Sequence, residues 1–227
     1  MKVLLKKVCL FMMMLLLTAT VVHAEEWKFA LEVVEGDVQD IYAQEFKKQI
    51  EAKTNGKVTI NIYHYGTLGD STDLTELAAD GAIQFANASP GHLGSFIPEV
   101  QMFAVPYIFS DSSSVNNELL SGSKAIYTEL ASDFDRRGIK LMTMYSSGSM
   151  VWVTNRVVRS PEDLNNFKMR ILAAPMLVET YKDFGASPTP MSFGEVYGGL
   201  QMKAIDGMAN PLSSIAAMKF YEVAPNL

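Results

Sequence analysis

The feature that most constrains the fold is the alternation of two apolar periods along the chain. In segments such as 27–33 (WKFALEV) and 57–63 (KVTINIY), apolar residues recur at every second position, as in a half-buried strand. Between them, residues 38–54 have helical spacing, with Asp37 as the capping residue and Asn55-Gly56 as the end. Strands that alternate with helices predict a predominantly α/β protein with parallel strands.

The same rules predict the remaining elements. We expect helices at 69–81, 123–138, 175–184 and 210–223, and strands at 82–86, 139–145, 150–155 and 167–172. The spacing of Ser192 and Glu195 places Phe193 in the first turn of another helix. No glycine-serine or charged linker separates the halves, so any two lobes would be joined by the crossings of the fold itself.

Residues 1–24 predict a secretory signal peptide. Three lysines precede an apolar run at 8–22, which ends at the small-residue site VHA, so we expect cleavage after Ala24. A membrane helix is the alternative, but this run is shorter than the about 20 residues that usually cross a bilayer. The only cysteine, Cys9, lies within the signal, so the exported chain must rely on a hydrophobic core rather than on disulfides. These features predict a periplasmic protein.

Charge and motifs exclude several functions. Residues 25–227 hold all 25 acidic residues but only 16 of the 19 basic ones, and a net charge of −9 argues against nucleic acid or anionic lipid as a partner. His64 and His92 stand alone, without the neighbouring ligands of a metal site, so no metal is expected. No cofactor-binding or nucleophile motif occurs, and we expect no cofactor and no enzyme activity. An exported enzyme built from distant residues is the alternative, because catalytic groups meet in space.

Spacing alone gives the candidate binding residues ordinary structural roles. In FKMRIL, parity groups Arg170 with Lys168 and predicts a solvent-facing charged stripe. By the same reasoning Glu32 is a residue of the polar face of a strand, and Phe85 and Phe193 are core residues. Asn210-Pro211 would start a turn. These patterns indicate an exported α/β domain and no more.

A long stretch at 168–212, KMRILAAPMLVETYKDFGASPTPMSFGEVYGGLQMKAIDGMANPL, together with LGD at 68–70 and KFYEV at 219–223, resembles the solute-binding subunits of tripartite ATP-independent periplasmic (TRAP) transporters. EGDVQD at 35–40 and QFANASPG at 84–91 look most like the branch that binds ectoine and related compatible solutes.

The resemblance implies a two-lobed α/β fold with strands passing between the lobes, lobe I at 25–147 and lobe II at 148–227. Such a protein, expected to be a monomer, closes on a small organic carboxylate or zwitterion and hands it to the small and large membrane subunits.

The resemblance also implies the site. Arg170 is similar to the family's carboxylate-binding arginine, with Asn210 as its hydrogen-bonding companion. Phe193 falls at the aromatic position, Phe85 would help to cover the apolar body of the ligand, and Glu32 would face a cationic part. A guanidinium meets a carboxylate through two parallel charge-assisted hydrogen bonds, which a lysine does not reproduce.

Three departures from the family pattern leave alternatives open. Met150 stands where many members carry a second arginine, which disfavours dicarboxylates and leaves a monocarboxylate and a zwitterion as near equals. Ser213 and Ser214 stand where an aromatic residue follows the Asn-Pro, which counts against ectoine. Family members normally continue well past YEV, so the chain is expected to be a truncated record, a shortened protein or a non-functional fragment whose first lobe lacks its closing elements.

Overall fold

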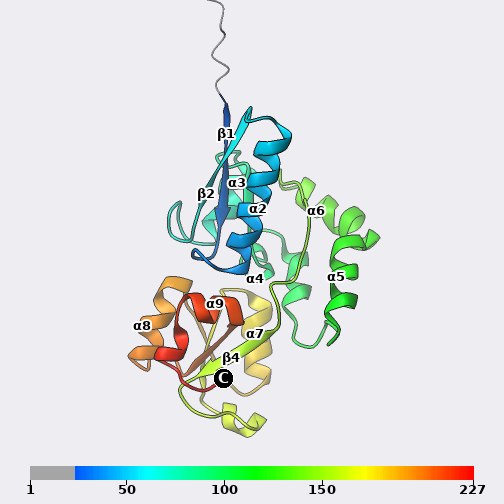
Figure 1. Ribbon diagram of the computed structural model, residues 1–227. Coiled ribbons are helices and arrows are strands. Elements are labelled where there is room, and N and C mark those ends of the chain that lie inside the picture. The colour runs from blue at the N-terminus through cyan, green and yellow to red at the C-terminus, as the bar shows by residue number, and fades with distance from the viewer. Residues whose placement is uncertain (1–23) are drawn as a thin grey trace, which may run out of the picture.

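The structure is a computed structural model, and it describes residues 24–227. The expected signal peptide lies outside the described residues except for Ala24. In Figure 1 the chain forms two groups of strands and helices, one above the other, and we refer to the group with β1 as lobe I and to the group with β4 as lobe II. The prediction of an α/β protein is confirmed.

Lobe I is built on a three-stranded parallel sheet with the order β2-β1-β3. The expected capping residue Asp37 accepts a hydrogen bond from the backbone N–H of Gln39 and starts the helix that returns the chain after the first strand. Apolar residues of alternating strand positions pack under this helix, as the period predicts. The elements are β1 (Glu25–Leu31), α2 (Val38–Lys53), β2 (Val58–Tyr63), α3 (Asp73–Ala79) and β3 (Phe85–Asn87).

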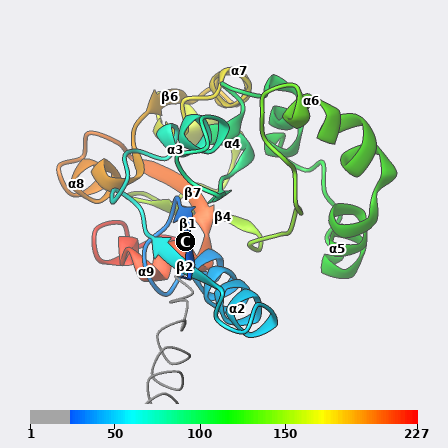
Figure 2. The ribbon, with the colours of Figure 1, turned by 90° about the horizontal axis from the view of Figure 1, so that it is seen from above.

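The rest of lobe I is helical, and Figure 2 shows α5 and α6 lying to one side of both sheets. The helix expected at 123–138 forms as a π-helical segment, Ala125–Leu130, that continues into α6. The other elements are α4 (Pro90–Leu93), a 3₁₀ segment (Pro98–Ala104), α5 (Ser113–Gly122) and α6 (Ala131–Asp135).

The prediction of a strand at 139–145 is wrong. This segment has no strand as a neighbour in the described chain, and the backbone N–H of Met144 donates instead to the Tyr127 hydroxyl at 2.9 Å. Its alternating apolar residues, Ile139 and Leu141, are explained by packing against a helical cluster that includes Phe134. The alternation therefore indicates only that one side of the segment is buried, and an extended segment can be buried on one side without joining a sheet.

Lobe II has a four-stranded sheet with the order β4-β7-β5-β6. β4 runs antiparallel to β7, so the expectation of parallel strands holds only for β5, β6 and β7. In Figure 1, α7 and α8 flank this sheet on opposite sides. The elements are β4 (Met150–Thr154), β5 (Lys168–Ile171), α7 (Pro175–Asp183), β6 (Ser187–Pro190), α8 (Val196–Gln201), β7 (Gly207–Pro211) and α9 (Leu212–Ala217), with 3₁₀ segments at Pro161–Leu164, Phe193–Glu195 and Phe220–Glu222.

The prediction of one helix over 210–223, starting with a turn at Asn210-Pro211, is wrong in part. Asn210 pairs with Val151 of β4 and Pro211 ends β7, so the helix begins only at Leu212. Lys219 has a left-handed backbone (φ 54°), which divides the helical stretch into two pieces.

Candidate functional site

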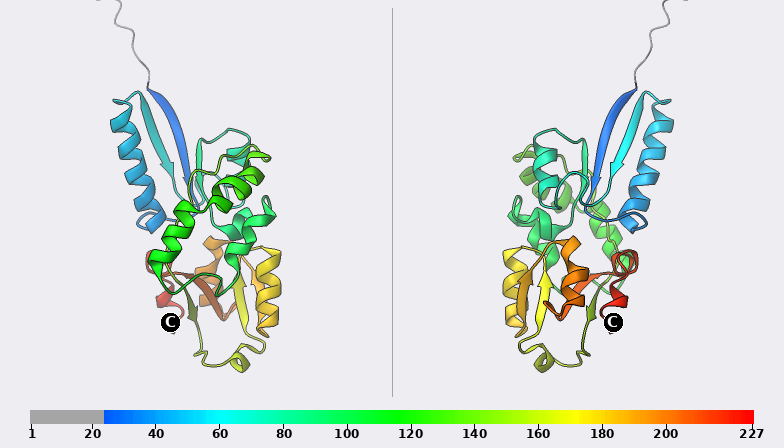
Figure 3. Two further views of the ribbon diagram at one scale, coloured as in Figure 1. Left: turned by 90° about the vertical axis from the view of Figure 1, so that its right-hand side faces the viewer. Right: turned by 90° about the vertical axis from the view of Figure 1, so that its left-hand side faces the viewer.

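The carboxyl ends of the lobe I strands point toward lobe II. In Figure 3 the arrowheads of β1 and β2 are directed at the lower lobe. In open α/β sheets, ligands bind beyond the carboxyl ends of parallel strands. The residues that follow these strands, Glu32 after β1, Tyr65 after β2 and Ser89 after β3, are therefore the first candidates for a site.

Arg170 lies on β5, an inner strand of the lobe II sheet, and only 2% of it is exposed. Its Nε donates to the backbone oxygen of Met191 at 2.9 Å, while its Nη2 is buried and has no hydrogen-bond partner within residues 24–227. Burial lowers the pKa of Arg170 to about 10, and the nearby Tyr65, Asp70 and Glu32 act in the opposite direction. The solvent-facing stripe predicted from parity is thus wrong for Arg170, because the sheet face on which it lies is covered.

Glu32 is also buried, with 6% exposed, and the polar strand face predicted from spacing is wrong for it. Its carboxylate oxygens are contacted by His92 Nδ1 at 2.6 Å, Ser89 Oγ at 3.2 Å and Gln39 Nε2 at 3.2 Å. Burial alone raises the pKa of Glu32, but the hydrogen bonds and the charge of His92 outweigh it and leave the pKa below 4.5. The site therefore holds an ionised carboxylate on lobe I and a guanidinium on lobe II.

Direct contacts hold the two lobes together around these charges. Ser214 Oγ donates to Asp37 Oδ2 at 2.6 Å, and both residues are buried. The backbone N–H of Gly194 donates to Tyr65 Oη at 3.0 Å, and the Tyr65 ring meets Phe193 edge-on at 5.5 Å. The loops after β1 and β2 thus close on the amino ends of α9 and α8.

Phe193 and Asn210 lie on the same side of lobe II as Arg170. Arg170 is paired in register with Met208 of β7, and alternation along β7 puts Asn210 on the same face as Met208. Phe193 is 5% exposed and packs in the cluster that contains Met208. The structure therefore brings Arg170, Asn210 and Phe193 to the same side of the lobe II sheet, and Glu32 is close enough to Arg170 to act on its pKa.

Phe85 does not join this group. Its ring packs against Trp27, Phe29 and Phe46, with centroid distances of 5.6, 5.7 and 5.0 Å, in the core of lobe I. We therefore leave Phe85 out of the candidate site, and the structural role given by its spacing describes it better.

Several residues of the site were missed by sequence reasoning. They are Tyr65, Asp37, His92, Ser89 and Asn87. Asn87, at the end of β3, donates to the hydroxyl of Tyr145, whose ring stacks on Tyr42 with the ring centroids 4.6 Å apart. Burial raises the pKa of Tyr145 to about 12. Most of them could have been found from the sequence, because they lie at or just after the end of a predicted parallel strand, where ligands bind in open α/β sheets.

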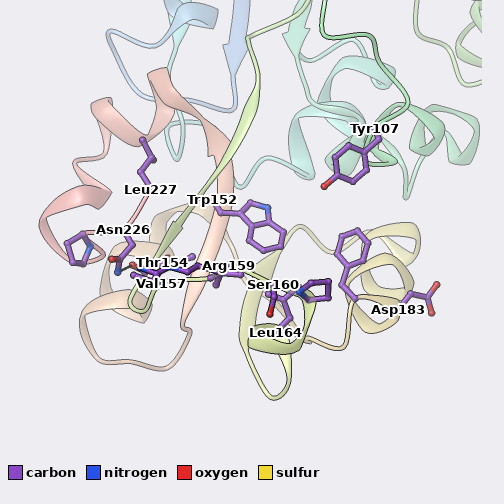
Figure 4. A pocket seen from close by; sticks show the side chains of 14 residues that line it. Tyr107, Trp152, Thr154, Val157, Arg159, Ser160, Leu164, Asp183, Asn226 and Leu227 are labelled. Atoms are coloured by element: carbon purple, nitrogen blue, oxygen red, sulfur yellow. Dashed lines mark hydrogen bonds between the residues drawn. The ribbon is translucent and has the colours of Figure 1, made fainter.

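A separate hollow of about 820 Å³ lies on lobe II, and Figure 4 shows it from close by. Trp152, Thr154, Leu164 and Asn226 line it, and Tyr107 of lobe I overhangs it. None of the five predicted site residues lines this hollow. Among residues 24–227, no group of three or more histidine, cysteine or acidic side chains is arranged to hold a metal ion.

A two-lobed α/β chain with a buried arginine and a buried glutamate where the lobes meet is the arrangement of a solute-binding protein. Residues 29–227 match the family described as bacterial extracellular solute-binding protein, family 7, and the chain belongs to that family. Proteins of this family are extracytoplasmic binding proteins. No helix within residues 24–227 is both long and apolar enough to cross a membrane.

Two curated relatives are similar over most of the chain. It is 43% identical over 209 residues to the ectoine-binding periplasmic protein TeaA of Halomonas elongata, and 41% identical over 208 residues to the ectoine/5-hydroxyectoine-binding periplasmic protein UehA of Ruegeria pomeroyi. Both matches cover 92% of this chain and 61% of the relative, so the chain spans about three fifths of their length. The solved structure of the periplasmic ectoine-binding protein of H. elongata matches with a TM-score of 0.84 and 42% identity, over 88% of this chain and 64% of that chain.

Proposed function

We propose that this chain is the solute-binding protein of a TRAP transporter, and that it captures a small organic solute by pairing the carboxylate of the solute with Arg170. The observation that carries the proposal is the guanidinium of Arg170, which is buried at the facing ends of the lobes and whose Nη2 has no partner in the described part of the chain. A buried charge without a partner is costly, and a carboxylate is the group that a guanidinium binds best.

The same cost explains how the ligand controls closure. Without a ligand, bringing the lobes together buries Arg170 with no carboxylate on it, so the empty closed state is disfavoured. A bound carboxylate removes that penalty, and the Asp37–Ser214 and Tyr65–Gly194 hydrogen bonds then help to hold the lobes together. The membrane subunits, which are the expected partners, recognise the closed, ligand-bound conformation. The protein acts as a monomer.

The charges favour a zwitterion as the solute. Glu32 is held ionised by its hydrogen bonds and by the charge of His92, so the site offers a carboxylate on lobe I as well as a guanidinium on lobe II. An ectoine-like solute, with a carboxylate at one end and a delocalised cation at the other, satisfies both charges. The names of TeaA and UehA, which are ectoine-binding proteins, support this class.

A plain monocarboxylate is the second candidate. His92 Nδ1 lies 2.6 Å from Glu32 Oε2, and a protonated His92 neutralises the charge of Glu32 without a cationic ligand. Arg170 alone would then bind the anion, with Asn210 as the companion hydrogen-bonding residue and Phe193 beside it.

The proposal includes export and the lobe boundaries. Residues 1–24 act as a signal peptide that is cleaved after Ala24, which delivers the protein to the periplasm. The lobes divide between residues 147 and 148, in the extended segment that leads from α6 into β4.

Calorimetric titration with ectoine, lactate and succinate tests the proposal. Wild type should bind ectoine or lactate more tightly than succinate, and Arg170→Ala should weaken binding by about 30-fold or more, because truncating one partner of a buried charge pair costs about 2–5 kcal/mol. Arg159→Ala, a change at an exposed arginine, is the control and should leave affinity unchanged. Equal affinities of wild type and Arg170→Ala for every ligand would show that Arg170 is not the anion-binding residue. Recovery of a chemically altered ligand would favour the exported enzyme instead.

A further inference from the structure

The side chain of Gln39 carries a hydrogen-bond acceptor for which the described residues supply no donor. Gln39 lies in the first turn of α2, and its Nε2 donates to Glu32 Oε1 at 3.2 Å. The ionised carboxylate of Glu32 only accepts hydrogen bonds, so the amide nitrogen of Gln39 must face it. The amide oxygen, Oε1, is then the atom of Gln39 that does not bind Glu32. This oxygen is buried and has no hydrogen-bond partner within residues 24–227.

The contacts around Gln39 indicate where this oxygen lies in the molecule. Oε2 of Glu32 is engaged by both His92 and Ser89, whereas Oε1 has only Gln39 as a side-chain partner within residues 24–227. Asp37, two residues before Gln39, bonds to Ser214 of lobe II, which places the first turn of α2 at the junction of the lobes. The unpaired acceptor therefore belongs to the same junction as Glu32.

Five buried side-chain polar atoms have no hydrogen-bond partner within residues 24–227; three are hydroxyl oxygens, and the other two lie on opposite lobes. Arg170 Nη2 on lobe II can only donate, and Gln39 Oε1 on lobe I can only accept. Glu32 adds a charged acceptor next to Gln39. A ligand that fits this set has a carboxylate at one end and, at the other, a cation with two neighbouring N–H groups.

Resting on the proposed function, we propose that Gln39 is a substrate-contacting residue that selects solutes whose cation carries two N–H donors. One N–H binds Glu32 and the second binds Gln39 Oε1, as the two N–H groups of an amidinium can do. A quaternary ammonium such as that of glycine betaine has the positive charge but no N–H, and it leaves the buried oxygen unpaired. Gln39 thus separates two classes of zwitterion that Arg170 and Glu32 alone would treat alike.

Titration of wild type and Gln39→Met with ectoine, glycine betaine and lactate tests this inference. Methionine keeps the length of the side chain and removes both amide groups. We expect Gln39→Met to weaken ectoine binding by about tenfold to a hundredfold, the effect of one hydrogen bond from a charged donor, and to change the other two affinities by less than about threefold. Gln44→Met is the matched control, because Gln44 lies on the same helix and donates to a different carboxylate, that of Asp40.

Each outcome decides the matter. A selective loss for ectoine supports a direct contact with Gln39. Equal weakening of all three ligands means that Gln39 only positions Glu32, and unchanged ectoine affinity means that it does neither, so both overturn the inference. If wild type binds lactate or glycine betaine as tightly as ectoine, the inference about Gln39 is overturned, but the proposal that Arg170 binds the carboxylate stands. This comparison uses wild type alone, so it does not depend on the folding of any variant. Wild type that binds none of the three overturns the inference together with the proposed function.

Discussion

Replacing Arg170 by methionine is expected to stabilise the ligand-free protein while it abolishes carboxylate binding. Arg170 is 2% exposed, and burial lowers its pKa from 12.5 to about 10. One pKa unit corresponds to 1.36 kcal/mol, so folding into the closed conformation disfavours the charged side chain by about 3 kcal/mol, and this cost falls to the extent that the empty lobes open and hydrate Arg170. Methionine fills a similar space without this cost.

The expected gain is smaller than that penalty. The substitution also removes the hydrogen bond from Arg170 Nε to the backbone oxygen of Met191, which contributes about 1 kcal/mol. A net gain of about 2 kcal/mol raises the melting temperature of a chain of this size by roughly 4–8 °C.

Differential scanning calorimetry at pH 7 without ligand measures the effect. The control is Arg159→Met, because Arg159 is exposed and its replacement should change the unfolding free energy by less than about 0.5 kcal/mol. A melting temperature of Arg170→Met at or below that of wild type would refute the reasoning, since the guanidinium would then be satisfied in the empty protein.

Two further predictions concern the hydrogen bonds of the site. Ser214→Ala should lower the free energy of unfolding by about 1.5–3 kcal/mol because the buried Asp37 carboxylate loses a hydrogen bond, whereas Ser213→Ala, which removes an oxygen with no partner in the described chain, should change it by less than about 0.5 kcal/mol. Urea denaturation compares them, and equal effects would contradict the role of Ser214. The pKa of Glu32 is lower in the folded state than its ordinary 4.5, so its contribution to stability is present above about pH 4.5 and is lost as the pH falls below that value. Glu32→Gln should therefore flatten the acid-side decline of the unfolding free energy, and a variant curve parallel to that of wild type would count against an ionised, hydrogen-bonded Glu32.

Local sequence patterns predicted the elements whose signals are local. The capping residue Asp37 and the helix α2 are where spacing and capping rules place them. Gly81 and Gly185, with φ of +72° and +83°, follow the ends of α3 and α7, where a left-handed glycine commonly ends a helix. The segment 139–145 failed because alternation shows that one side is buried but not that a neighbouring strand exists. β6 was not predicted, since Pro188 and Pro190 argue against a strand, and it is tolerated as the edge of its sheet.

The site was less accessible to local reasoning. Parity grouped Arg170 with Lys168 on a solvent-facing stripe, but whether that face is covered depends on the other lobe and on residues far away in the sequence. The burial of Glu32 likewise depends on His92, 60 residues later. The family resemblance, not the spacing, pointed to Arg170, Asn210, Phe193 and Glu32, and it pointed as well to Phe85, whose ring packs in the core of lobe I.

A crystal structure of the protein grown with ectoine tests the central claim most directly. We predict a carboxylate oxygen of the ligand at about 2.9 Å from Arg170 Nη2, the usual distance for a charge-assisted hydrogen bond, with the cationic ring directed at Glu32. Ligand bound elsewhere, for example in the hollow beside Trp152, with Arg170 Nη2 still unpaired, would contradict it.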